Sequence, residues 1–150
     1  MNISSLSDLT KVANKIKDVL LPGDCIFLYG EIGVGKTTFT RLLINNYELE
    51  NDLKKSEVLS PTFNIVYEYE FKNFNLKHYD FYRFKNEQDI NNVGLFENSK
   101  NSITLIEWPE LIKNKPKNRI DLFFKYSKDM KKRSLIIKSS GRLKKHEFRY

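Results

Sequence analysis

The placement of hydrophobic and polar residues predicts a helix and then a strand as the first elements of the chain. Over residues 6–20 the apolar side chains recur every three or four positions, which predicts an amphipathic helix. Ser5 or Ser7 can cap this helix, and a Pro-Gly pair at 22–23 ends it. Residues 25–29 form a short apolar run, which predicts a buried strand.

A second helix, a polar stretch and a hairpin are predicted next. The helix covers about residues 35–47, and the polar residues 48–56 are expected to be flexible. From Phe63 to Phe71 the pattern changes to period two, which predicts a strand, and residues 74–80 are its expected return partner. Because a hairpin is antiparallel, the sheet is expected to be mixed.

The remaining pattern predicts a short helix and three more strands. Residues 86–93 indicate a weak helix that Asn86 caps, and residues 103–107 are a second apolar run that ends in a carboxylate. Residues 119–126 and 133–139 flank a polar loop and predict a closing hairpin.

Composition then favours a globular chain without a membrane segment. The 150 residues are 40% apolar and 30% charged, with no repeat and no linker-like stretch, so a single domain over residues 1–150 is expected. The longest apolar runs are about five residues, far below the roughly 20 of a membrane helix. The N-terminus does not resemble a signal peptide, and the lone Cys25 is expected to be a buried, reduced thiol. These features point to the cytoplasm.

Positive charge is concentrated at the end of the chain. Residues 113–150 carry 14 Lys and Arg against three Asp and Glu, a net charge of +11 in a chain whose total is +7. Such a segment can attract nucleic acid or an acidic partner, or it can be only a solvated lysine-rich face. The last basic residues, 142–150, are expected to be loose.

The sequence GEIGVGKT at 30–37 matches the P-loop pattern, between a predicted strand and a predicted helix. Glycines let the backbone turn its N–H groups toward phosphate oxygens, the lysine supplies a charge at the β- and γ-phosphates, and the threonine hydroxyl is a ligand for Mg²⁺. A chance glycine-rich turn is the alternative, and the flanking elements disfavour it. The expected nucleotide-binding residues are Gly30, Glu31, Ile32, Gly33, Val34, Gly35, Lys36, Thr37 and Thr38.

The motif and the strand pattern together predict the fold class. We expect an α/β domain, a P-loop NTPase-like three-layer architecture with a mixed, partly antiparallel sheet, and we expect it to bind ATP and Mg²⁺.

Two carboxylates are candidates for the chemistry beside the phosphates. Glu107 ends an apolar strand as a Walker-B-like acid, which predicts that it manages Mg²⁺ or water beside the phosphates, although a strand-terminal surface glutamate is the alternative. Asp80 ends the return strand and can position water or a metal-bound water. The residues leave open which acid has which role. His78 faces the same side as Asp80 and is more simply explained as a hydrogen-bonded structural histidine.

Two further residues flank the predicted site. Thr62 lies in the loop between the P-loop helix and the next strand, where a switch threonine senses the γ-phosphate, although a plain turn explains it equally well. Trp108 follows Glu107 and is either a core residue or a flat wall of the site. Arg83 can reach phosphate or pair with a surface acid.

Four segments in this order resemble the TsaE family, also called the YjeE family: LYGEIGVGKTTFTRLL (28–43), SPTFNIVYEY (60–69), HYDFYRF (78–84) and LIEWPE (105–110). The resemblance covers roughly residues 5–140. Phe63 stands where the family often has Tyr, and the lysine-rich last third is the least similar part.

The resemblance implies a small P-loop ATPase, weakly active alone, that acts in making threonylcarbamoyladenosine in tRNA. It implies that Lys36 and its loop bind ATP, that Thr37 and Glu107 hold Mg²⁺, that Thr62 is switch-like, and that Asp80 acts at the γ-phosphate. It also implies that Trp108 lies close to the nucleotide.

The resemblance further implies that the adenine contact lies within residues 6–10, with the loop 131–133 approaching the nucleotide. The implied partners are the TsaB and TsaD proteins, the latter transferring the threonylcarbamoyl group to adenosine 37. The tRNA is expected to be contacted indirectly or through the basic last third.

Two other classes remain open from the residues alone. A small-molecule or nucleotide kinase also uses a P-loop, but such enzymes carry an arginine-rich lid, and the six arginines here are scattered. A nucleic-acid-binding module based on residues 113–150 would bind RNA in a strongly salt-dependent manner.

Overall fold

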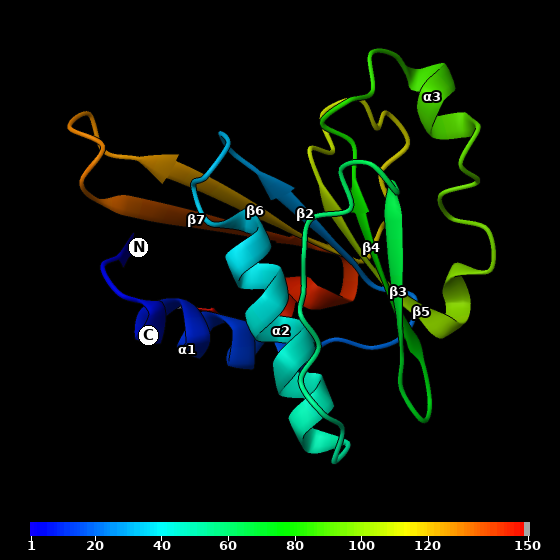
Figure 1. Cartoon of the computed structure of the whole chain (residues 1–150), viewed down its shortest axis with the longest axis horizontal. Coiled ribbons are helices and arrows are strands. Elements are labelled where there is room, and N and C mark those ends of the chain that lie inside the picture. The colour runs from blue at the N-terminus through cyan, green and yellow to red at the C-terminus, as the bar shows by residue number, and fades with distance from the viewer. Residues whose placement is uncertain (149–150) are drawn as a thin grey trace.

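Residues 1–148 are described by the computed structural model, and within them seven strands and three α-helices are formed (Figure 1). The strands are β1 (Asn2–Ile3), β2 (Cys25–Tyr29), β3 (Val66–Glu70), β4 (Asn75–Asp80), β5 (Ser102–Glu107), β6 (Arg119–Tyr126) and β7 (Arg133–Ser140). The helices are α1 (Leu6–Lys17), α2 (Lys36–Glu50) and α3 (Glu87–Asn91), with 3-10 turns at Ser99–Asn101 (η1) and Gly141–Lys145 (η2).

All seven strands join one sheet in the order β1-β7-β6-β2-β5-β4-β3. Strand β2 pairs in parallel with β5 and β6, and β4 pairs in parallel with β5. The pairs β3–β4, β6–β7 and β1–β7 are antiparallel. The expected mixed, partly antiparallel sheet is therefore confirmed, and the carboxyl ends of β2, β4 and β5 meet at one edge.

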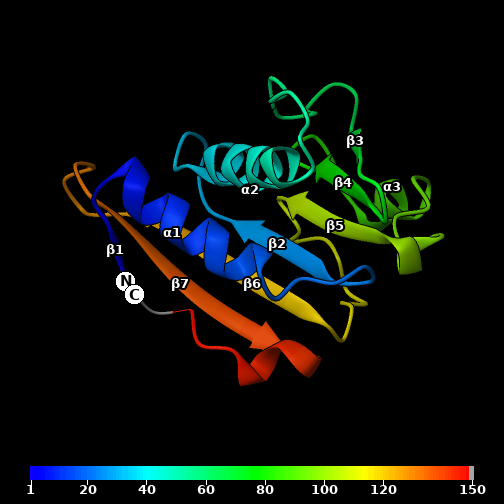
Figure 2. The same ribbon diagram turned by 90° about the horizontal axis from the view of Figure 1, so that it is seen from below.

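Helices α1 and α2 lie side by side on one face of the sheet (Figure 2). Their apolar sides form the larger core with residues such as Ile26, Leu28 and Leu122 of the central strands. On the other face, the segment from β4 to β6 that contains α3 covers β2, β4 and β5 with a smaller core around Phe27, Phe81 and Ile106. The expected three layers are present, and this third layer consists mostly of loops (Figure 1).

Helix α1 begins at the predicted residue and ends three residues before the predicted end. Ser5 is the cap, because its hydroxyl accepts from the Asp8 N–H while the Asp8 carboxylate accepts from the Ser5 N–H. After Asp18 the chain tightens: Val19 and Leu20 donate to carbonyls only three residues back. Both side chains still pack against the core, which explains why the apolar pattern continues to residue 20.

Helix α2 extends three residues beyond the predicted end, and the stretch that follows it is held in place. The carboxylate of Glu48 is buried and accepts from the Asn45 side-chain amide and the Ser56 N–H, at 2.8 and 2.9 Å. Glu50 pairs with the buried Lys17 of α1. The segment 48–56, which was expected to be flexible, is thus attached at Glu48, Glu50 and Ser56 through partners that a polar sequence does not reveal.

Strand β3 begins at Val66, three residues after the predicted start. Ile65 has a φ of +69° and donates its N–H to the Pro61 carbonyl, so the chain turns before it extends. Phe63, assigned by the period-two pattern to the strand, is 83% exposed on this turn. The alternation of residues 63–65 therefore arises in a loop.

Residues 142–148 of the tail that was expected to be loose make contacts with the core. Leu143 and Phe148 are buried, and Arg142 forms an ion pair with the buried Asp24 while donating to the Val19 carbonyl at 3.0 Å. Because these partners come from the turn after α1, no local pattern could predict them. Residues 149 and 150 of the predicted tail lie outside the described part of the chain.

Two further predictions concern Cys25 and the membrane. Cys25 is a buried free thiol, as expected, and burial raises its pKa to about 12. No helix within residues 1–148 has the length and apolar character needed to cross a bilayer.

Candidate functional site

The P-loop turns tightly between β2 and α2. Gly30 has a φ of +135°, and a Cβ at this position would lie 2.6 Å from the Phe124 carbonyl oxygen of the neighbouring strand. Gly35 has a φ of +119° and begins α2 in a left-handed conformation, with no atom within 4 Å of the position of a Cβ. Both positions therefore require glycine, and the N-terminus of a 15-residue helix opens toward free space, as phosphate binding requires.

Lys36 holds its ammonium inside the loop that precedes it. Its Nζ donates to the carbonyl oxygens of Gly30 and Glu31, at 2.6 and 2.9 Å, and lies 4.2 Å from the centre of the Trp108 ring. Burial lowers the pKa of Lys36, while the carboxylates of Glu107 and Asp80 oppose that shift. The ammonium of Lys36 thus lies at the mouth of the loop, where the charges of Glu107 and Asp80 act on it.

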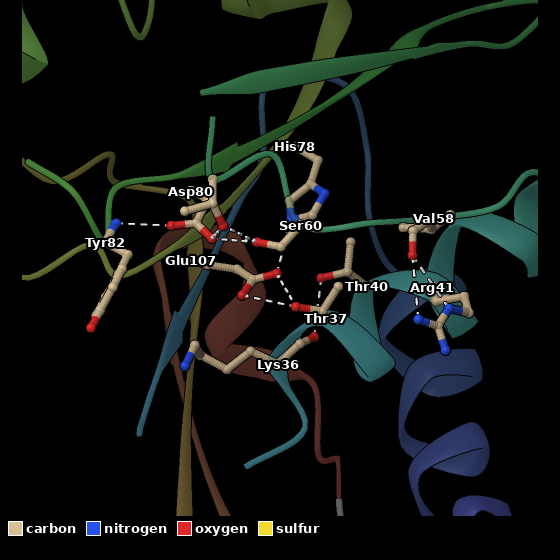
Figure 3. Close-up of polar contacts among 11 residues, drawn as sticks. Lys36, Thr37, Thr40, Arg41, Val58, Ser60, His78, Asp80, Tyr82 and Glu107 are labelled. Atoms are coloured by element: carbon tan, nitrogen blue, oxygen red, sulfur yellow. Dashed lines mark hydrogen bonds and ion pairs between the residues drawn. The ribbon is translucent and has the colours of Figure 1, made fainter. Parts of the chain in front are cut away.

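Thr37 and Glu107 meet between the first turn of α2 and the end of β5 (Figure 3). The Thr37 hydroxyl is 2.9 Å from Oε1 and 3.2 Å from Oε2 of Glu107. The Glu107 carboxylate is buried and contacts the ring of His78, whose Nε2 lies 2.9 Å from Oε1. A hydroxyl beside a carboxylate is a hard-oxygen donor pair, so these residues fit a magnesium ion.

Asp80 lies at the end of β4, directly opposite Glu107 in the parallel register. Its Oδ2 accepts from the hydroxyls of Ser60 and of Thr62, the latter at 3.2 Å, and its Oδ1 accepts from the Tyr82 N–H at 2.8 Å (Figure 3). The carboxylate is therefore oriented by the loop before β3 and by the turn after β4.

These side chains line one cavity of about 320 Å³ at the mouth of the P-loop. The lining residues are Ile32, Gly33, Gly35, Lys36, Thr37, Thr38, Ser60, Thr62, Asp80, Tyr82, Glu107 and Trp108. The sequence pattern placed Ser60 and Tyr82 in the conspicuous segments SPTF and HYDFYRF but did not single them out. Their role depends on the position of Asp80, which only the folded chain reveals.

Three of the predicted nucleotide-binding residues, Gly30, Glu31 and Val34, are not among those that line the cavity. Gly30 and Glu31 present carbonyl oxygens to Lys36, and Val34 is 1% exposed within the core. Trp108, by contrast, has a φ of +60°, which is strained for a bulky residue, and its ring faces Lys36 and Tyr82. It forms a wall of the cavity, as one of its two sequence interpretations expects.

His78 and Arg83 have partners in the folded chain. His78 is fully buried against Glu107, which fits the structural interpretation of this histidine. The guanidinium of Arg83 lies 5.2 Å from the centre of the exposed Phe63 ring and is not among the residues that line the cavity.

A second cavity of about 190 Å³ lies on the other side of Gly35 and Thr38. It is lined by Leu6 and Leu9 of α1 and by Arg133 of β7, together with Phe124 and Val34. The first turn of α1 and the end of the basic 131–133 loop, both expected near the nucleotide, thus lie beside the P-loop.

Comparison with known proteins shows the family to which the chain belongs. The family model for TsaE, the threonylcarbamoyl adenosine biosynthesis protein, matches residues 3–135. The tRNA threonylcarbamoyladenosine biosynthesis protein TsaE of Rickettsia felis is 36% identical over 112 residues, which are 75% of this chain and 63% of that protein. The protein of the same name from Bacillus subtilis is 34% identical over 110 residues, or 72% of this chain and 65% of that protein. The match therefore spans just under two thirds of these relatives' lengths.

The folds also correspond. The crystal structure of Bacillus subtilis YdiB superposes with a TM-score of 0.70 at 25% identity, covering 94% of this chain and 84% of that one. A family match over most of the residues and a shared fold lead to the same assignment: this chain belongs to the TsaE family, whose role is in tRNA threonylcarbamoyladenosine biosynthesis.

Proposed function

We propose that this protein binds Mg-ATP in the P-loop cavity and hydrolyses it slowly, as a component of the machinery that modifies adenosine 37 of tRNA. One observation carries the proposal. Lys36, Thr37, Asp80 and Glu107 come from three separate elements and line the same cavity of about 320 Å³. An ammonium, a hydroxyl and two carboxylates around a helix N-terminus are the groups that phosphoryl transfer to water requires.

The triphosphate is proposed to lie at the start of α2. Its β- and γ-phosphates would accept from the N–H groups of residues 33–37 and from the Lys36 ammonium, which would exchange the Gly30 and Glu31 carbonyls for phosphate oxygens. The adenine would lie toward the second cavity, against Leu6 and Leu9, with Arg133 at its edge. Thr38 lines both cavities and would lie beside the α-phosphate.

The proposed chemistry divides the two acids by their contacts. Thr37 and Glu107 would hold Mg²⁺, which supplies charge neutralisation at the β- and γ-phosphates when bound. Asp80 would orient the attacking water. The Thr62 hydroxyl, which donates to the Asp80 carboxylate, would assist it. The oxygen of this water would bond to the γ-phosphorus as the bond to the ADP oxygen breaks, its proton would pass to the Asp80 carboxylate, and Lys36 would stabilise the charge on the departing ADP.

Partners and location complete the proposal. Because the family's role is in tRNA threonylcarbamoyladenosine biosynthesis, we propose that the TsaB and TsaD proteins use the hydrolysis and that TsaD forms the bond to tRNA. We propose that the protein acts in the cytoplasm and that it contacts tRNA either indirectly or through residues 113–150.

The test is ATP hydrolysis by the purified chain, alone and with the TsaB–TsaD pair and tRNA. We expect slow turnover alone, a marked increase with the partners, and loss of both in a Lys36→Ala variant. Fast turnover without partners, or phosphate transfer to nucleosides instead of water, would contradict the proposal. In cells, modified tRNA that persists in a Lys36→Ala strain would exclude the proposed role.

A further inference from the structure

The face of the sheet opposite α1 and α2 is covered only in part. The segment that contains α3 packs over β2, β4 and β5, whereas no helix of residues 1–148 lies over that side of β6 and β7 (Figure 1). The register places Phe123 of β6 beside Tyr29 of β2 and Ile136 of β7 on this face. Ile136 is 44% exposed, and both aromatic rings are partly exposed. We call this surface, made of Tyr29, Phe123, Lys125, Ile136 and Lys138 with Lys115 at its edge, the β6–β7 face.

Two aromatic rings form a preassembled stack at the centre of the β6–β7 face. The rings of Tyr29 and Phe123 are 4.4 Å apart between centres and 10° from parallel. Two lysines contact the stack: Lys115 Nζ donates to the Tyr29 hydroxyl at 3.1 Å, at the edge of that ring, and Lys138 Nζ lies 5.3 Å from the centre of the Phe123 ring. Because Lys138 is exposed, long and flexible, it can move off the Phe123 ring at low cost.

The charge of the β6–β7 face is positive. Lys115, Lys125 and Lys138 are exposed. The acid on the same side of β6, Asp121, is buried and accepts from Arg119 Nε through both carboxylate oxygens at 2.9 Å, so its charge is paired. The whole segment 113–150 carries a net charge of +11. The face is therefore complementary to a polyanion.

We propose that the β6–β7 face binds a single-stranded loop of RNA. A base would extend the Tyr29–Phe123 stack at its Phe123 end, because Tyr29 also packs against the smaller core, and the displaced Lys138 would pair with the adjoining phosphate. Stacked rings flanked by Lys115 and Lys138 match the alternation of bases and phosphates in a strand, whereas an acidic protein surface would satisfy only the cations. The choice of RNA rests on the proposed role in tRNA modification; the binding itself requires no nucleotide in the P-loop.

The experiment is fluorescence anisotropy of a labelled RNA hairpin with an unpaired loop, titrated with the full chain at several salt concentrations. We expect binding that weakens steeply with salt. Phe123→Leu and Lys138→Glu should each weaken it about tenfold, and Lys115→Glu, which changes a loop and not a strand, should act like Lys138→Glu. Thermal denaturation of each variant separates lost binding from lost folding.

Two controls make the outcome decisive. Lys144→Glu makes the same charge change in the same basic segment but on η2, and it should have a clearly smaller effect than Lys138→Glu. Lys36→Ala should bind RNA like the wild type, since this binding is separate from the P-loop. Equal losses from Lys144→Glu and Lys138→Glu with none from Phe123→Leu would overturn the proposal. An absence of RNA binding by the wild type would also overturn it. So would variants of the β6–β7 face that bind RNA normally and lose only their association with TsaB and TsaD. None of these results would change the Mg-ATP affinity that tests the proposed function.

Discussion

Thr37 and Glu107 are 70 residues apart in the chain, and the hydroxyl of the first donates to the carboxylate of the second at 2.9 Å. Their meeting follows from the fold: β2 and β5 are parallel neighbours, with Leu28 opposite Glu107, so the P-loop and the end of β5 share one edge of the sheet. This pair is the proposed magnesium site.

Glu107→Gln should lower magnesium affinity without unfolding the chain. The amide oxygen can still accept from Thr37, but the negative charge that attracts the cation is lost. We expect the Mg²⁺ concentration needed for half-maximal binding of a fluorescent ATP analogue to rise at least about tenfold. Thr40→Ala, which removes a buried hydroxyl from the next turn of α2, is the matched control. An unchanged magnesium requirement would show that Glu107 is not a ligand.

His78→Leu tests whether the histidine orients Glu107. The ring is fully buried, and within the described residues its Nδ1 has no hydrogen-bond partner, so Nε2–H to the carboxylate is its one polar contact. Without this donor, Glu107 should adopt more than one orientation, and magnesium affinity should fall about tenfold. His78→Gln, which keeps an N–H donor, should recover most of it. If the two variants behave alike in the magnesium titration, the ring only fills space.

Asp80→Asn should separate binding from hydrolysis. The residue forms hydrogen bonds with Thr62, Ser60 and the Tyr82 N–H and acts on Lys36 only through its charge, so ATP affinity should not fall. Single-turnover hydrolysis should fall by about 100-fold, since water would lose its orienting base. Ser60→Ala removes one donor to the same carboxylate and should cause a smaller loss. Comparable loss of affinity and rate in Asp80→Asn would place Asp80 in nucleotide binding instead.

Arg142→Met should destabilise the fold, although the residue lies in the segment that the sequence suggests is loose. Its guanidinium pairs with Asp24, whose side chain is 2% exposed, and removing one partner of a buried pair leaves the other charge uncompensated. We expect the free energy of unfolding in urea to fall by about 3 kcal/mol. The double variant with Asp24→Asn should recover part of the loss. A change within about 0.5 kcal/mol, as for ordinary surface positions, would contradict the packing of this segment.

Local patterns predicted the parts of this fold that depend on short-range physics. The apolar run at 25–29, the caps at Ser5 and Asn86, and the glycine-rich loop all appear where the sequence predicts them. Strand β1 was not predicted, because two residues carry no period and its pairing depends on β7.

The site was predictable in composition but not in its connections. The P-loop, Asp80 and Glu107 were identified from motif and strand position. The contact of His78 with Glu107 and those of Ser60 and Tyr82 with Asp80 depend on the parallel register of β4 and β5 and on the turn after β4. Sequence periodicity gives the face of a strand but not its neighbour.

The most direct test of the account is isothermal titration calorimetry of the chain with ATP in the presence of Mg²⁺. We predict saturable binding at one site that is lost in Lys36→Ala and weakened when magnesium is removed by a chelator. Heat of binding that is absent from the wild type, or that is unchanged in Lys36→Ala, would contradict the claim that residues 30–37 hold a nucleotide.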